Sequence, residues 1–171
     1  WSSDVCSSDL VADMSDLFSF ATSMNADLSN WDVSSVMKMN SMFRGASSFK
    51  ADLSKWDVSR VTNMESMFED ATLFDADISK WDVSSVTTMD SMFSKATLFN
   101  ADLSKWDVSS VTSMAKMFNG ASSFTRDLCG AWYTSTASKK AMFEGSSGRI
   151  CGTPQMPSLL DSPKSDRKST R

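Results

Sequence analysis

One phrase of the sequence recurs at a fixed interval, and this repeat constrains the fold more than any other feature. The segment ADLSKWDVSSVT at 101–112 has near-identical copies at 26–37, 51–62 and 76–87. Their tryptophans are spaced 25 residues apart and are Trp31, Trp56, Trp81 and Trp106. A constant period of this length is typical of arrays in which each unit buries its apolar face against its neighbours. We therefore predict an array of 25-residue units.

Within one unit, two apolar patterns follow each other. Apolar and polar residues alternate around Trp56, which favours a strand, and the wording L-x-x-W-x-V-x-x-V from Leu53 has the spacing of a leucine-rich repeat. Beyond it, apolar residues recur at steps of three and four, which favours one face of a helix. These are Val61, Met64, Met67, Phe68 and Ala71. The sequence therefore predicts an α/β fold, a leucine-rich-repeat-like solenoid of strand–turn–helix units with a parallel sheet and an internal tryptophan stack.

The repeat covers only part of the chain, so we divide the chain into four parts. We expect the solenoid over 11–151, with a degenerate last unit acting as a cap, because Trp132 comes one residue late. Residues 152–165 are rich in proline and serine and are expected to form a flexible tail. Residues 1–10 and 166–171 resemble translated sequencing-adapter DNA, since DVCSSD and DRKSTR can be read from opposite strands of one such sequence. We expect both to be artefacts at the ends of a fragment.

Composition argues against several classes of function. The formal net charge is −4 and the repeats hold no basic cluster, which disfavours nucleic-acid binding. No apolar run reaches the roughly 20 residues of a transmembrane helix. The chain has no histidine, and neither a nucleophile–base pair, a phosphate loop nor a metal-ligand cluster is visible in the sequence. We therefore expect a protein that is not an enzyme and that needs no cofactor.

The most suggestive candidate site is a row of charged residues with one set in each unit. On the strand interpretation, the aspartate after each tryptophan and the lysine before it lie on the exposed face of the sheet, with serines beside them. The predicted binding residues are Asp32, Asp57, Asp82, Asp107, Lys55, Lys80, Lys105, Ser59 and Ser84. A regular charged strip suits an extended protein or glycan. The alternative is a solvated surface on which the lysines neutralise the aspartates.

A second row of aspartates precedes the tryptophans. Its members are Asp27, Asp52, Asp77, Asp102 and Asp127. Calcium favours clustered carboxylates, which makes a calcium row one hypothesis. An aspartate before a strand also accepts backbone N–H groups in a turn, and we favour this structural interpretation because the row lacks a glycine-rich loop.

Two cysteines flank the end of the array. With Cys6 set aside among residues 1–10, Cys129 and Cys151 are left. We expect them to form one disulfide in an oxidising compartment, with a contribution of about 3 kcal/mol. Two free buried thiols are the alternative.

The sequence motif of the repeat also resembles that of a known protein family. The motif M-x-x-M-F-x-x-A-x-x-F-N-x-D-L-S-x-W-D-V-S-S-V-T, over about 11–145, is similar to that of the BspA-type leucine-rich-repeat surface proteins. The departures are Trp132 and the alanines Ala26, Ala51, Ala76 and Ala101, where the family often has glutamine. The resemblance implies a secreted or surface-displayed array with a binding or adhesive role and carries over no catalytic residue.

From these observations we expect an extracellular or cell-surface binding module that engages a protein or glycan through its exposed strand face. We expect it to be a monomer. The alternative function is a structural spacer that displays other domains at the cell surface.

Overall fold

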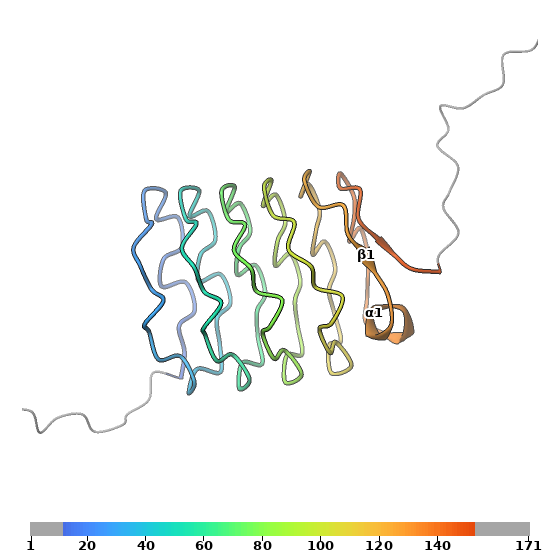
Figure 1. Cartoon of the computed structure of the whole chain (residues 1–171), viewed down its shortest axis with the longest axis horizontal. Coiled ribbons are helices and arrows are strands. Elements are labelled where there is room, and N and C mark those ends of the chain that lie inside the picture. The colour runs from blue at the N-terminus through green and yellow to red at the C-terminus, as the bar shows by residue number, and fades with distance from the viewer. Residues whose placement is uncertain (1–11, 153–171) are drawn as a thin grey trace, which may run out of the picture.

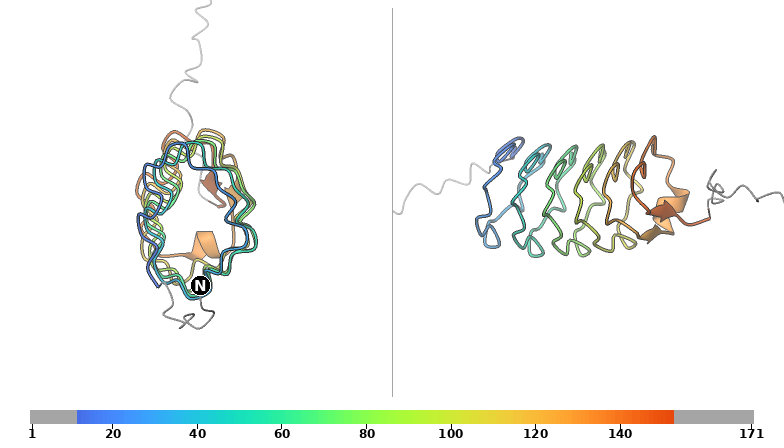
Figure 2. Two further views of the ribbon diagram at one scale, coloured as in Figure 1. Left: turned by 90° about the vertical axis from the view of Figure 1, so that its left-hand side faces the viewer. Right: turned by 90° about the horizontal axis from the view of Figure 1, so that it is seen from above.

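The computed structural model describes residues 12–152, which form a stack of coils around one core. Successive coils lie side by side along the long axis of the molecule (Figure 1) and superpose as one ring when seen along that axis (Figure 2). Residues one period apart pair as parallel bridges from coil to coil. They are Asp13, Lys38, Asn63, Thr88, Ser113 and Ser138. One 25-residue repeat of the sequence is therefore one coil of the chain.

The predicted fold class is wrong at the level of secondary structure. Between residues 12 and 152 the chain has a single helix, α1 (Ala131–Thr134), and a single two-stranded sheet, in which β1 (Asp127–Leu128) pairs in parallel with β2 (Arg149–Ile150). The coils themselves consist of turns and irregular chain. The array is therefore not a solenoid of strand–turn–helix units, and the exposed strand face expected on such units does not exist within this part of the chain.

Two residues with positive φ at the same positions of each coil explain why the predicted helix of the repeat does not form. In the coil 51–75 they are Ser66 and Asp70, with φ of 53° and 58°. Ser66 lies inside a turn that is closed by the backbone N–H of Met67 and the carbonyl of Met64. An α-helix needs an uninterrupted right-handed backbone, so a left-handed residue every few positions excludes it. The apolar steps of three and four instead mark successive tight turns whose apolar side chains point inward.

Backbone hydrogen bonds between coils take the place of those inside a helix. The N–H groups of Met64, Ser66, Phe68 and Asp70 donate to carbonyl oxygens 24 residues further on, at 2.8–3.1 Å. The same four bonds join every pair of neighbouring coils from residue 14 to residue 144. We call this set of bonds the turn ladder. It fixes the register of each coil on the next.

Two rows of phenylalanine run through the core along the stack. The first row is Phe43, Phe68, Phe93 and Phe118, with 5.5–5.7 Å between neighbouring ring centroids. The second is Phe49, Phe74, Phe99 and Phe124, at 5.9–6.1 Å. All eight side chains are fully buried. Because each ring contacts its counterpart in the next coil, the core of one coil is completed by its neighbours.

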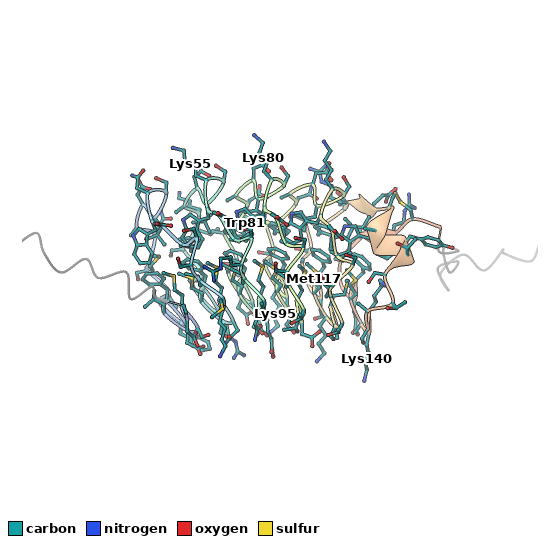
Figure 3. All side chains as sticks on the ribbon, turned by 90° about the horizontal axis from the view of Figure 1, so that it is seen from below. Lys55, Lys80, Trp81, Lys95, Met117 and Lys140 are labelled. Carbon is teal, nitrogen blue, oxygen red and sulfur yellow. A yellow bond between two sulfur atoms is a disulfide. The ribbon has the colours of Figure 1, made fainter. Side chains whose placement is uncertain are left out.

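The tryptophans also join neighbouring coils. The indole N–H groups of Trp56, Trp81 and Trp106 donate to backbone carbonyls of the preceding coil at 3.0–3.2 Å. Their rings are buried, and Figure 3 shows Trp81 within the stack while Lys55 and Lys80 project from one edge. Trp31, in the first of these units, is 39% exposed. Burial thus holds for three of the four tryptophans, but among the described residues the ring contacts of Trp56 and Trp81 are with phenylalanines and not with each other.

The last coil absorbs the register shift that the sequence shows at Trp132. Its indole N–H donates to the carbonyl of Leu103 at 2.9 Å, the same bond as in the other coils but over 29 residues instead of 28. The short helix α1 contains Trp132 and takes up the extra residue. A disulfide joins Cys129 to Cys151, with their Cα atoms 4.8 Å apart, next to the pairing of β1 with β2.

The remaining predictions on chain organisation concern the two ends. The adapter-like segments 1–10 and 166–171, and the expected tail from 153 onward, lie outside the described residues. In the part that is described, no helix has both the length and the apolar character needed to cross a membrane.

Candidate functional site

The aspartates that follow the tryptophans form turns. In Asp57, Oδ1 accepts the backbone N–H of Ser59 at 3.1 Å. The equivalent bonds of Asp32, Asp82 and Asp107 measure 3.0–3.1 Å. Hydrogen bonds from the serine hydroxyl and backbone hold the pKa of all four carboxyls below its usual value. The first role of this predicted binding row, including Ser59 and Ser84, is therefore to fix the chain direction after each tryptophan.

Within residues 12–152, no ion pair joins the lysines to this row, although the alternative of a neutralised surface would need one. The electrostatic neighbours of Asp82 are Asp57 and Asp107, which raise its pKa against the larger lowering by Ser84. Lys55 instead lowers the pKa of Asp52 in the other aspartate row. Lys55 lies in a turn that is closed by a hydrogen bond from the Trp56 N–H to the Leu53 carbonyl. This turn directs the Lys55 side chain back toward Asp52. A strand would have placed Lys55 and Asp57 on one face.

The second aspartate row also forms turns. Four of its members accept the backbone N–H of the serine two residues later, at 2.8–3.0 Å. They are Asp27, Asp52, Asp77 and Asp102. The fifth, Asp127, accepts a bond of 2.7 Å from Arg149 instead. Residues 12–152 hold no group of three acidic, cysteine or histidine residues placed to hold a metal ion, so the geometry favours turn formation over calcium binding.

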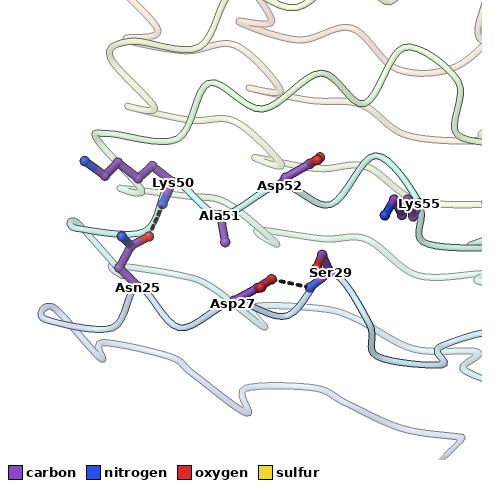
Figure 4. A pocket seen from close by; sticks show the side chains of 7 residues that line it. All are labelled: Asn25, Asp27, Ser29, Lys50, Ala51, Asp52 and Lys55. Atoms are coloured by element: carbon purple, nitrogen blue, oxygen red, sulfur yellow. Dashed lines mark hydrogen bonds between the residues drawn. The ribbon is translucent and has the colours of Figure 1, made fainter.

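Between neighbouring coils, the second aspartate row lines a series of shallow grooves, which we call the groove row. The first groove, drawn in Figure 4, has a volume of about 440 Å³. Its lining includes Asn25, Asp27, Lys50, Asp52 and Lys55. The next two grooves, of about 380 and 350 Å³, repeat this arrangement one and two coils further on. The charged residues that line the second groove are Lys50, Asp52, Asp77 and Lys80. Those that line the third are Asp75, Asp77, Asp102 and Arg126.

The walls of the groove row are fixed to each other by side-chain bonds across the coils. Asn25 Oδ1 accepts the backbone N–H of Lys50 at 3.0 Å, as the dashed line in Figure 4 shows. Asp75 and Asn100 make the equivalent bond at 3.0 Å two coils later. The aspartates are held by their own turns, so the charged groups of each groove start from backbone positions that are already ordered.

The structure therefore divides the predicted binding residues into two sets. Lys55 and Lys80 line the groove row, and Lys105 acts on Asp102 beside it. The four aspartates that follow the tryptophans, with Ser59 and Ser84, lie outside the grooves described above. Sequence reasoning did not identify Lys50 or Arg126 as groove residues. The signal that could have found them is their place just before an aspartate of the second aspartate row, since Lys50 lies two residues before Asp52 and Arg126 directly before Asp127.

One protein-family model matches the chain twice, and both matches cover the repeats. The family model described as "Mycoplasma protein of unknown function, DUF285" matches residues 5–78 and 51–149. The chain belongs to this family. The DUF285 description assigns no activity or ligand, and the first match begins within the segment 1–10 that the sequence analysis sets aside. No curated protein and no solved structure matches the chain.

Proposed function

We propose that this DUF285 chain is a non-catalytic binding module of a secreted or cell-surface repeat protein, and that it binds an extended protein or glycan along the groove row. The observation that carries the proposal is the repetition of one groove, with aspartates and at least one cation, from coil to coil. A partner with a repeating backbone would meet the same donors and acceptors at each coil, so weak contacts would add along its length.

The charges of the grooves suit polar recognition. Asp27, Asp52 and Asp77 carry a lowered pKa because serine N–H and hydroxyl groups donate to them, so they are ionised acceptors at neutral pH. Lys55 and Lys80 are exposed and supply donors within the same grooves. Such a set can bind the hydroxyls of a glycan or the alternating charges of a peptide, and its fixed walls reduce the entropy that binding costs.

Two further observations support a location outside the cell. The disulfide between Cys129 and Cys151 fits an oxidising compartment. The repeat wording resembles the BspA-type surface proteins, which are secreted or displayed. Because the strand face expected from the alternating apolar pattern is absent between residues 12 and 152, the proposed contact surface is the groove row and not the row of Asp57 and its counterparts.

The proposal is tested by screening the full chain against a glycan array and immobilised extracellular-matrix proteins. The test variant is Lys55→Asn with Lys80→Asn, because Asn30 occupies the same coil position in the first unit and shows that asparagine fits there. We expect its affinity for any hit to fall about tenfold, from two exposed charge contacts of up to ~1 kcal/mol each.

The matched control is Lys95→Asn with Lys116→Asn, which removes the same charge from residues outside the groove row. Both residues have positive φ, which asparagine adopts readily. The control should bind like the unaltered chain. Equal binding by the test variant, or equal losses in both variants, would contradict the groove row as the contact surface.

A structural spacer is the second candidate function. The turn ladder favours it, because four backbone bonds at each junction make the stack stiff along its axis. A chain that binds nothing in the screen would support this candidate over the binding module.

A further inference from the structure

The two ends of the stack carry complementary unpaired backbone groups. At the last coil, the N–H groups of Lys139, Ala141, Phe143 and Gly145 donate to no acceptor within residues 12–152. At the first coil, the carbonyls of Asp13, Ser15, Leu17 and Ser19 accept from no donor within the same range. These are the groups that form the turn ladder at every inner junction. Counting partners from residues 12–152 alone, the last coil thus ends in four unpaired donors and the first coil in four unpaired acceptors, in matching register.

The phenylalanine row also ends at the first and last coils in rings that are only partly buried. Phe143 stacks on Phe118 at 5.6 Å and Phe18 on Phe43 at 5.5 Å, and each is only partly buried because its outer face has no counterpart. Beside Phe143, the last coil has an apolar hollow of about 360 Å³ that Met142 also lines. At the first coil Leu17 is 50% exposed, although its equivalents in the inner coils are fully buried methionines. Each end therefore exposes apolar surface that an added coil would cover.

The charges of the two ends are opposite. Asp13 and Asp16 lie at the first coil, whose residues 12–25 include no lysine or arginine. The last coil, 126–150, carries four basic residues, Lys139 and Lys140 among them, against two acidic ones, so it is positive overall. Asp16 and Lys140 are exposed, and neither side chain has an ion-pair partner among the described residues. Contact between the two ends would therefore be attractive.

We propose that the last coil of one chain binds the first coil of a second copy, which continues the turn ladder and the phenylalanine row across the junction. Phe143 then stacks on Phe18 of the next copy, and the donors from Lys139 to Gly145 meet the carbonyls from Asp13 to Ser19. The two surfaces differ, so the contact is heterologous and each added copy leaves both kinds of end free. The product is an open-ended row of copies, in place of the monomer expected from the sequence.

The proposal is tested by sedimentation velocity of the full chain over a concentration series. We expect the weight-average sedimentation coefficient to rise steadily with concentration without levelling off at a dimer. A chain that sediments as a monomer throughout, or that stops at a closed dimer, would overturn the proposal.

Two single charge reversals locate the contact. Lys140→Glu and Asp16→Lys each place like charges at the junction and should each weaken association by about five- to tenfold. Both fit the backbone, since Glu65 and Lys116 occupy the equivalent positions in inner coils. The matched control, Arg60→Glu, makes the same charge change at an exposed residue that lies away from both ends and outside the grooves, and it should associate like the unaltered chain.

Mixing the two variants gives the deciding result. In a mixture, the last coil with glutamate at position 140 meets the first coil with lysine at position 16, and the two unaltered ends meet each other, so both kinds of junction bring opposite charges together. We therefore expect an equimolar mixture to recover the association that each variant loses alone. Failure of the mixture to recover, or an equal loss in Arg60→Glu, would overturn the head-to-tail contact while leaving the groove-row proposal unaffected.

Discussion

At the scale of single residues, aspartate has one dominant structural role in this chain. In both aspartate rows, with Asp127 as the exception, Oδ1 accepts the N–H of the serine two residues later and so fixes a turn before or after the tryptophan. The hydrogen bonds lower the pKa of these carboxyls, and the same bonds leave the carboxylate side chains exposed to solvent. A residue type that looks functional from its regular spacing is thus explained first by local backbone geometry.

This role makes stability depend on pH. Because the folded-state pKa of the capping aspartates is lowered, their contribution to stability is present above the unfolded value of about 3.9 and is lost as pH falls through the lower folded values. We expect Tm to be constant from pH 7 to about 5 and to fall below about pH 4. Asn keeps the acceptor but does not titrate, so Asp57→Asn, Asp82→Asn and Asp107→Asn combined should lessen this fall. An unchanged fall in Tm would contradict the assigned role.

The free energy of unfolding that is lost when a tryptophan is replaced depends on how deeply that tryptophan is buried in the stack. Trp81 is 4% exposed and donates its indole N–H to the Leu53 carbonyl. We expect Trp81→Ala to lower the free energy of unfolding by about 3–5 kcal/mol, measured by urea denaturation. Trp31→Ala is the matched control. It should cost clearly less because this ring is 39% exposed, and equal costs would contradict the stacked arrangement.

At the scale of elements, the period was predictable from the sequence and the secondary structure was not. The tryptophan spacing gives the coil length directly. The helix prediction failed because two consecutive tight turns reproduce the apolar steps of three and four that a helix produces. A signal against the helix was present: Gly45, Gly120 and Gly145 share one coil position, and all have positive φ. The groove row was missed because Lys55 was assigned to a strand, whereas it lies in a turn.

The turn assignment makes a prediction for the left-handed residues. Ser91 has a φ of 55°, which a β-branched residue adopts only with strain. We expect Ser91→Val to destabilise the chain by about 1–2 kcal/mol in urea denaturation. Ser110→Val is the control, because Ser110 is exposed and its φ is not positive. On a helical account, both serines would tolerate valine about equally.

At the scale of the whole molecule, stability comes from contacts between neighbouring coils. Each inner coil shares its turn ladder, phenylalanine rows and tryptophan bond with the coils on either side, so the ends are the least supported parts. The described end at the last coil is held by the disulfide and by the pairing of β1 with β2. The position of this disulfide could be expected from the sequence, because two cysteines flank the end of the repeat.

Reduction of the disulfide should therefore act locally before it acts globally. We expect a reductant to increase hydrogen exchange first between Cys129 and Cys151, and to lower the free energy of unfolding by about 3 kcal/mol. Cys129→Ser with Cys151→Ser should show the same faster exchange without reductant and no further response to it. Uniform acceleration over all coils would contradict local stabilisation of the last coil.

The central claim is that segments with the apolar spacing of a helix are instead turns bonded to the next coil. Scalar couplings across hydrogen bonds, measured by NMR, test it most directly. The account predicts couplings from the amide nitrogens of Met64, Ser66, Phe68 and Asp70 to the carbonyl carbons of residues 88, 90, 92 and 94. Couplings from these amides to carbonyls four residues earlier in the chain would show a helix and contradict the account.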